Sequence, residues 1–206
     1  MDTQLIVRPP DKRLIERGKL FVDRLAERRT CILRQLSSDW KEEMGFWRWL
    51  GNEKISIRWL TEQSLLPIKS RCMVNGRHVL SIQDSSTIGF KAFAGRKKGL
   101  RRVGTTGDCP GFIIHPNLLL DAQDGRCLGV GELSVFDEWV AKGDQEAVRQ
   151  LETEEKKTGR WIRAGKAVRK SLEGAHMVTH IADREADFYE MLVEFGQNRQ
   201  ENEHLV

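Results

Sequence analysis

The chain has 206 residues, of which 39% are hydrophobic and 31% are charged, which is typical of a soluble globular protein with one or two domains. No stretch approaches the roughly 18 apolar residues that a membrane span needs, and the N-terminus lacks the apolar segment of a signal peptide. We therefore expect a cytoplasmic protein without a membrane partner. Four widely spaced cysteines without a C-x-x-C pair argue against a zinc site or a disulfide framework: Cys31, Cys72, Cys109 and Cys127.

The formal net charge is only +4, but the charges are unevenly distributed. Residues 1–74 hold 15 Lys/Arg against 10 Asp/Glu, and residues 91–102 hold six bases and no acid. Residues 184–206 hold two bases and six acids. A basic face and an acidic end favour a polyanion-binding protein. For residues 91–102 alone, a solvated surface loop is an equally good interpretation.

The first part of the chain has the period of α-helices. Asp11 starts a helix with one apolar stripe, formed by Leu14, Gly18, Phe21 and Leu25. A second helix is expected between the cap Asp39 and Gly51, and a third between the cap Ser56 and Pro67. The tryptophans of this region are interpreted as core anchors of a small bundle, with base stacking as the alternative: Trp40, Trp47, Trp49 and Trp59.

After residue 75 the pattern changes to that of β-strands. Strands are expected at 78–84, 111–121, within 126–139 and at 176–183, with a hairpin turn at 122–125. Helices are expected at 160–172, where Trp161, Gly165, Val168 and Leu172 form one stripe, and at 184–196. Three meandering strands and a helical crossover to a fourth predict an α/β fold, a mixed sheet flanked by helices.

Two aspartates end strands of this expected sheet. Asp84 ends the first strand and Asp183 ends the fourth. If a crossover places these strands side by side in parallel, both carboxylates meet at one sheet edge, where they suit Mg²⁺ or Mn²⁺ and phosphodiester chemistry at a two-metal site. The alternatives are local: Asp183 caps the following helix, and Asp84 starts a turn with Ser85 and Ser86.

The two aspartate segments also carry a family resemblance. "SIQDSSTIGF" and "IADREADFYEML" resemble two signature blocks of bacterial transposases of the insertion-sequence-four (Tn-five-like) family, within the Asp-Asp-Glu superfamily. "EKKTGRWIRAGKAV" and "GFIIHPNLLLD", with its histidine, resemble two further family segments. The resemblance implies an RNase H-like (retroviral integrase-like) core over residues 75–206 and a helical DNA-binding domain over residues 1–74.

The resemblance also implies a chemistry. Asp84 and Asp183 would be the first two carboxylates of the metal triad, holding Mg²⁺ or Mn²⁺ for cut-and-paste transposition of double-stranded DNA at transposon ends. Each step in that family is an in-line attack on phosphorus at one two-metal centre. The bases expected to contact DNA phosphates are Lys97, Lys98, Arg101 and Arg102.

One family feature is missing from the sequence. The third ligand of the family is a glutamate in a downstream Tyr-Arg-Glu-Lys pattern, which this sequence does not contain, and the family's dimerisation region is missing too. His204, Leu205 and Val206 resemble the start of a fifth strand. We therefore expect an N-terminal fragment that is inactive in cleavage. The alternatives are a non-enzymatic DNA-binding protein that competes for transposon ends and an unrelated nuclease of the same fold.

Overall fold

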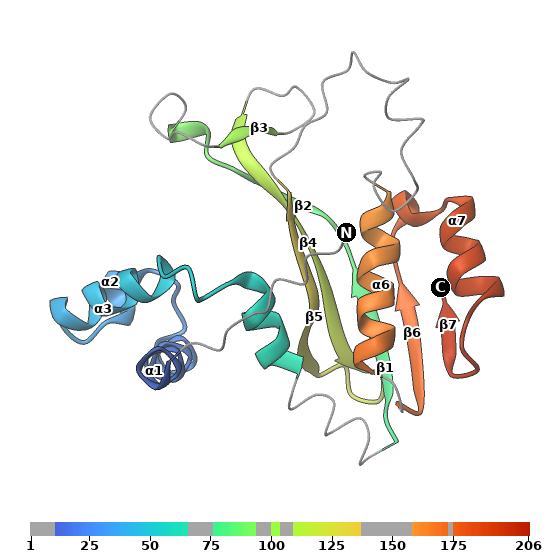
Figure 1. The fold of residues 1–206 in the computed structure, drawn as a ribbon, viewed down its shortest axis with the longest axis horizontal. Helices are drawn as coiled ribbons and strands as arrows, with labels where there is room; N and C mark the ends of the chain where they lie inside the picture. Colours follow the sequence, from blue (N-terminus) through green and yellow to red (C-terminus); the bar gives the residue numbers. More distant parts are fainter. Residues whose placement is uncertain (1–10, 66–75, 94–99, 104–108, 137–157, 173–174) are drawn as a thin grey trace. The chain divides into compact units, whose positions relative to one another are not determined.

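A computed structural model describes residues 11–65, 76–93, 100–103, 109–136, 158–172 and 175–206 (Figure 1). The chain forms two compact units, Met1–Leu60 and Thr61–Val206. Sequence analysis placed the domain boundary at residue 74. The helical residues 57–65 run across the division between the units, so their last turn belongs with the second unit.

The described part of the first unit is helical. It contains α1 (Lys12–Arg28), α2 (Leu33–Leu36) and α3 (Trp40–Leu50). The Asp11 carboxylate accepts hydrogen bonds from two amides of the first turn of α1, and the Asp39 carboxylate accepts one from Glu42 N at 2.8 Å. Gly51 is the C-cap of α3. These helix ends were therefore predicted correctly, because an N-cap acts on amides of its own turn.

Aromatic rings join α1 to α3. A Cβ added to Gly18 would lie 2.8 Å from the Trp49 ring, so the glycine is what lets the two helices approach. Phe21 meets Phe46 edge to face at 5.0 Å between ring centroids. The indole Nε1 of Trp49 donates to the backbone oxygen of Leu14 at 2.8 Å. The buried tryptophan thus has its polar atom satisfied within the core.

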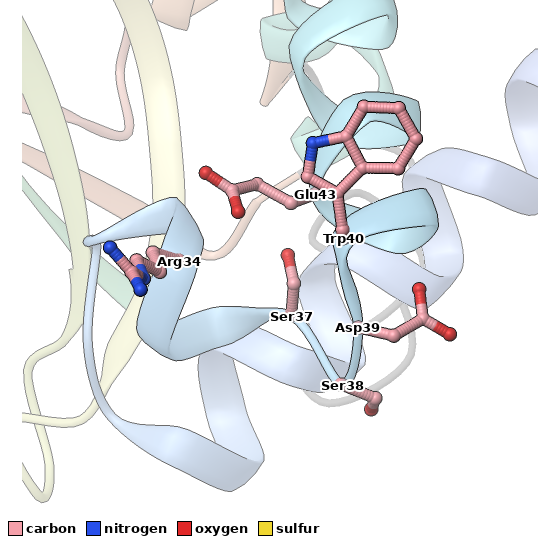
Figure 2. Close-up of a pocket in the computed structure, with 6 residues that line it drawn as sticks. All are labelled: Arg34, Ser37, Ser38, Asp39, Trp40 and Glu43. Atoms are coloured by element: carbon pink, nitrogen blue, oxygen red, sulfur yellow. The ribbon is translucent and has the colours of Figure 1, made fainter.

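The expectation that all four tryptophans are core anchors was wrong for two of them. Trp49 and Trp59 are buried, but Trp40 is 69% exposed and Trp47 is 55% exposed. These two side chains are seven residues apart, two helical turns along the face of α3 away from α1. Trp40 borders an open hollow of about 510 Å³, whose lining mixes one cation with two acids: Arg34, Ser37, Ser38, Asp39, Trp40 and Glu43. Figure 2 shows these six side chains.

The described part of the second unit contains seven strands in one mixed sheet, which confirms the α/β expectation. They are β1 (His78–Gln83), β2 (Ser86–Gly89), β3 (Arg101–Val103), β4 (Cys109–Asp121), β5 (Cys127–Phe136), β6 (Met177–Ile181) and β7 (Glu203–Leu205). The order β4-β1-β6-β7 is antiparallel at its first step and parallel at the next two. β5 pairs with β4 through the expected hairpin. The short strands β2 and β3 were not predicted.

Helix α6 (Gly159–Ser171) covers one face of this sheet (Figure 1). Its predicted stripe is buried: Trp161, Val168 and Leu172 are at most 3% exposed. Gly165 on the same stripe lies directly against the Phe195 ring, where any Cβ would overlap it. Val168 and Leu172 share a core cluster with Val79, Leu119 and Val178 of the sheet.

The single helix expected at 184–196 is instead three short pieces. A 3₁₀ turn, η2 (Arg184–Ala186), is followed by α7 (Tyr189–Leu192) and then by η3 (Val193–Gln197), which has π-helical hydrogen bonds. Phe188 has an extended backbone (φ −133°, ψ 152°) and separates the first two pieces. Ala186, Met191 and Phe195 are buried around Trp161, and the break is what turns all three towards it.

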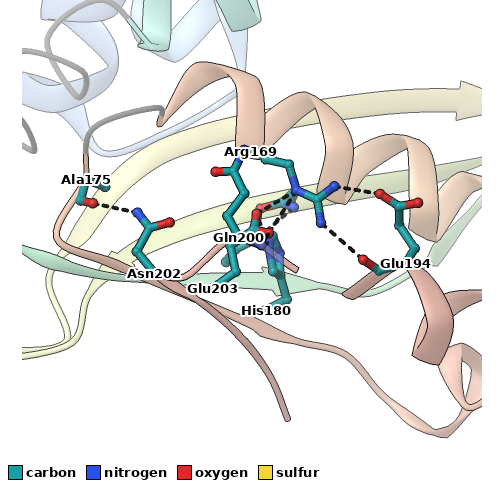
Figure 3. A network of polar contacts seen from close by, with 9 residues as sticks. Arg169, Ala175, His180, Glu194, Gln200, Asn202 and Glu203 are labelled. Atoms are coloured by element: carbon teal, nitrogen blue, oxygen red, sulfur yellow. Dashed lines mark hydrogen bonds and ion pairs between the residues drawn. The ribbon is translucent and has the colours of Figure 1, made fainter. Parts of the chain in front are cut away.

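A buried network fastens the edge strand β7 (Figure 3). Arg169 Nε donates to both carboxylate oxygens of Glu203 at 2.8 and 2.9 Å, and its Nη1 donates to Glu194. His180 Nε2 lies 3.4 Å from Glu203, and His180 Nδ1 lies 3.2 Å from Ser81 Oγ. Burial alone would raise the pKa of Glu203, but hydrogen bonds from His180, Arg169 and the Gln200 amide outweigh it and lower the pKa to about 2.

Replacing the carboxylate of Glu203 should destabilise this unit. The pKa of Glu203 is depressed, so its contribution is present above about pH 4.5 and is lost as the pH falls towards 2. Glu203→Gln should lower the free energy of unfolding by about 3 kcal/mol at pH 7, because it leaves Arg169 short of a buried partner. Urea denaturation measures this, with the exposed neighbour Glu201→Gln as control. Equal stability of the two variants would contradict the anchoring role.

Candidate functional site

The parallel pairing of β1 with β6 brings the two sequence-predicted aspartates to one edge of the sheet. Ile82 pairs with Ile181 at the last rung of the ladder. Asp84 and Asp183 each follow two residues later, so they leave neighbouring parallel strands at the same level. The adjacent strand ends expected from the sequence are therefore present. The roles of the two carboxylates stay predictions.

The backbone around Asp84 explains why its strand parts from β6. Gln83 pairs with Asn117 and Ser86 with Ile114, which leaves Asp84 and Ser85 opposite Pro116 and His115. A proline has no N–H to donate to the ladder. β1 and β2 are thus successive parts of one path along β4, interrupted at Asp84, whereas β6 ends at Ile181. The aspartate at this interruption is exposed.

Each carboxylate is held by its own loop through one oxygen. Asp84 Oδ1 accepts from Ser85 N at 2.6 Å, and Asp183 Oδ1 accepts from Glu185 N at 2.9 Å. The alternative that Asp183 caps the helix after it is therefore confirmed, since Asp183 is the N-cap of η2. Among the described residues, neither Oδ2 atom has a hydrogen-bond partner. Both aspartates are exposed, so a capping oxygen and an available oxygen coexist in each side chain.

Arg160, in the first turn of α6, contacts both aspartate loops. Its Nε donates to Ser85 Oγ at 2.9 Å, and its Nη2 donates to Glu185 Oε2 at 2.8 Å. Ser85 directly follows Asp84, and Glu185 lies two residues after Asp183. Trp161, the next residue of α6, is fully buried and packs edge to face on His115 at 4.6 Å between ring centroids.

His115 supports the Asp84 loop from beneath. Its Nδ1 lies 2.9 Å from Ser85 Oγ and its Nε2 lies 3.2 Å from Gln83 Oε1. Since Gln83 Oε1 can only accept, Nε2 carries the proton, and Nδ1 of the neutral ring accepts from Ser85. Burial, with Arg160 and Arg163 nearby, lowers the pKa of His115 to about 4, although Asp183 opposes the shift. The ring is therefore neutral at pH 7.

Sequence analysis assigned no role to these supporting residues. His115 and Arg160 both lie in segments that carry the family resemblance. Neither residue, however, stands in a sequence pattern that would indicate a contact with Ser85. Their contacts join segments 30 and 75 residues apart, from Ser85 to His115 and from Ser85 to Arg160. Contacts between residues so far apart in the chain produce no periodic pattern in the sequence.

The basic segment is only partly within the described structure. Lys97 and Lys98 lie outside the described residues. Arg101 and Arg102 lie in β3, where Arg101 pairs with Gly111 of β4. Gly111 is four positions along β4 from His115, about 13 Å at the rise of a β-strand. The expected contacts of these bases with phosphate stay a prediction.

Two oxygen donors at a sheet edge could hold a divalent cation such as Mg²⁺ or Mn²⁺, which prefer carboxylate ligands. Within the described ranges, no group of three or more His, Cys, Asp or Glu side chains is placed to hold a metal ion. A divalent ion bound there would take the two aspartates as part of its coordination shell. Across the same ranges, no helix is long and apolar enough to cross a membrane.

Comparison with known proteins finds no matching family model and no matching curated protein. Similar solved structures include a Mos1 transposase paired-end complex with left transposon end, at 13% identity and a TM-score of 0.28, covering 96% of this chain and 59% of that one. A Mos1 strand transfer complex gives 14% identity and the same TM-score, with 96% and 58% covered. The chain thus spans about three fifths of the length of these two structures.

The neutral state of His115 predicts a pH dependence of stability. Because its folded pKa is depressed from 6.5 to about 4, its contribution is complete above about pH 6.5 and is lost progressively as the pH falls towards 4. The loss should reach about 3 kcal/mol at most, and His115→Gln should remove the part between pH 6.5 and 5. Urea titrations across this range measure it, with the exposed His176→Gln as control. A wild-type slope in His115→Gln would count against the assignment.

Proposed function

We propose that this chain carries two carboxylates of a metal-dependent DNA cleavage and strand-transfer site, as in cut-and-paste transposases. The observation that carries the proposal is the exit of Asp84 and Asp183 from adjacent parallel strands at one level of the sheet. The sequence blocks around both aspartates, which resemble those of the insertion-sequence-four family, support it independently. The mixed sheet with α6 on one face fits an RNase H-like core.

The available atoms fit a divalent cation. Each aspartate has one oxygen fixed by its loop amide and a second without a partner among the described residues, as a ligand requires. A bound Mg²⁺ or Mn²⁺ would polarise the scissile phosphate and favour ionisation of the attacking water or 3′-hydroxyl. The protein's own part is to hold the carboxylates, through the loop amides, Ser85, Arg160 and the neutral His115 beneath them.

Double-stranded DNA is the proposed partner. The helical unit and the segment 91–102 carry the excess positive charge, and such charge acts chiefly on phosphates. Recognition of transposon ends and dimerisation on DNA belong to the same proposal, by resemblance alone. The second candidate is a DNA-binding protein without cleavage. It is favoured by one observation: among the described residues, no third ligand accompanies the aspartate pair.

The carboxylates of Asp84 and Asp183 should together bind Mn²⁺. Isothermal titration should show binding to the wild type, at least tenfold weaker in Asp84→Asn or Asp183→Asn because each change removes a charged ligand. Asp187→Asn, which changes an exposed carboxylate on the same segment, is the matched control.

The purified chain should not nick plasmid DNA at a useful rate, because two carboxylates position the ion poorly.

Either of two results would change this picture. Wild-type Mn²⁺ affinity in Asp84→Asn would remove the pair as a metal site. Robust Mg²⁺-dependent nicking that Asp84→Ala abolishes would show that a further acid completes the site, and it would exclude the DNA-binding candidate.

DNA binding should be modest and steeply dependent on salt. Each phosphate neutralised contributes a slope of about 0.9 in log affinity against log salt. Replacing Lys97, Lys98, Arg101 and Arg102 with Ala should therefore flatten the slope by about two to four units and weaken binding to all sequences. Fluorescence anisotropy at several salt concentrations measures this, with Arg199→Ala as a single-charge control. An unchanged slope would mean that these four bases are solvated and do not contact phosphates.

A further inference from the structure

We infer that Arg160 is a positioning residue that fixes the Asp84 and Asp183 loops relative to each other, an inference that rests on the proposed function. One guanidinium spans both loops: Nε donates to Ser85 Oγ at 2.9 Å and Nη2 to Glu185 Oε2 at 2.8 Å. Each partner also acts on its aspartate, since the amides of Ser85 and Glu185 are the donors to Asp84 Oδ1 and Asp183 Oδ1. Arg160 thus acts on each carboxylate through one intermediate residue: Ser85 for Asp84 and Glu185 for Asp183.

The Arg160 side chain is held in place by its surroundings at the start of α6. Arg160 belongs to α6, whose next residue, Trp161, is fully buried, and its own side chain is only 14% exposed. Its guanidinium carbon lies 5.7 Å from the centroid of the Trp161 ring. On the other side, Ser85 Oγ is held by His115, which is itself held by Gln83. The chain of contacts therefore connects α6 and the sheet interior to the Asp84 loop.

The bridge contributes geometry more than stability. The Glu185 side chain is 63% exposed, and an ion pair at such a site adds little to the free energy of folding. The contacts to Ser85 and Glu185, however, leave the guanidinium in different directions, through Nε and through Nη2. A lysine ammonium carries the same charge on one atom and cannot reproduce this planar fork. Charge and geometry can therefore be separated by one conservative change.

The experiment compares Arg160→Lys with Arg184→Lys in the full chain. Arg184 is an exposed cation between Asp183 and Glu185, so its replacement is a matched control. Mn²⁺ affinity is measured by isothermal titration, and the Ser85 and Glu185 amides are followed by ¹H–¹⁵N spectra without metal. In Arg160→Lys we expect Mn²⁺ binding about 10- to 100-fold weaker, as for other residues that orient metal ligands. Both amide signals should move, with thermal stability unchanged.

The two readouts keep the inference and the proposed function apart. If the wild type binds Mn²⁺ through Asp84 and Arg160→Lys binds equally well, the positioning role is overturned. If the wild type binds no Mn²⁺, or Asp84→Asn binds it normally, the proposed function fails, and the spectra alone then decide on the bridge. The positioning role of Arg160 is overturned in every case if the amide signals move equally in Arg184→Lys, or if they stay in place in Arg160→Lys.

Discussion

The parallel pairing of β1 with β6 is the constraint on which the rest of the second unit depends. It joins segments 99 residues apart, Ser81 to His180, and sets the level at which Asp84 and Asp183 leave the sheet. A parallel pair needs a crossover, and α6, which precedes β6, packs against β5, β4 and β1 of the same sheet. The helix therefore closes the core and also brings Arg160 to the aspartate loops.

The face beneath α6 is unusual in burying a row of polar side chains. Ser81, Gln83, His115, Asn117 and His180 are at most 2% exposed. Such a row is tolerable only when its members hydrogen-bond with one another, as Ser81 does with Asn117 and His180. Three buried side-chain donors have no partner among the described residues: Arg77 Nε, Gln83 Nε2 and Trp161 Nε1. Gln83 and Trp161 both contact His115.

Sequence reasoning succeeded where the deciding contacts are local. The caps Asp11 and Asp39 act on amides two or three residues away, and the buried stripe of α6 follows from its period. It failed where a choice between two faces was needed. Trp40 and Trp47 carry the same apolar signal as Trp49, yet both are more than half exposed, whereas Trp49 is buried against Gly18 of α1. The break at Phe188 was missed because it depends on a contact distant in sequence: Ala186 and Met191 are both buried in one cluster with Trp161, although five residues of unbroken helix would put them on different faces.

The sequence by itself determined the order of elements, the strand-terminal positions of Asp84 and Asp183 and the likeness of their segments to transposase blocks, since all three are written in short-range pattern. Only the tertiary structure decided that the two strands are neighbours, that Pro116 interrupts the ladder opposite Asp84, and that Arg160 and His115 converge on Ser85. Strand register and helix docking are set by burial summed over the whole sheet. No local stretch of residues encodes that sum.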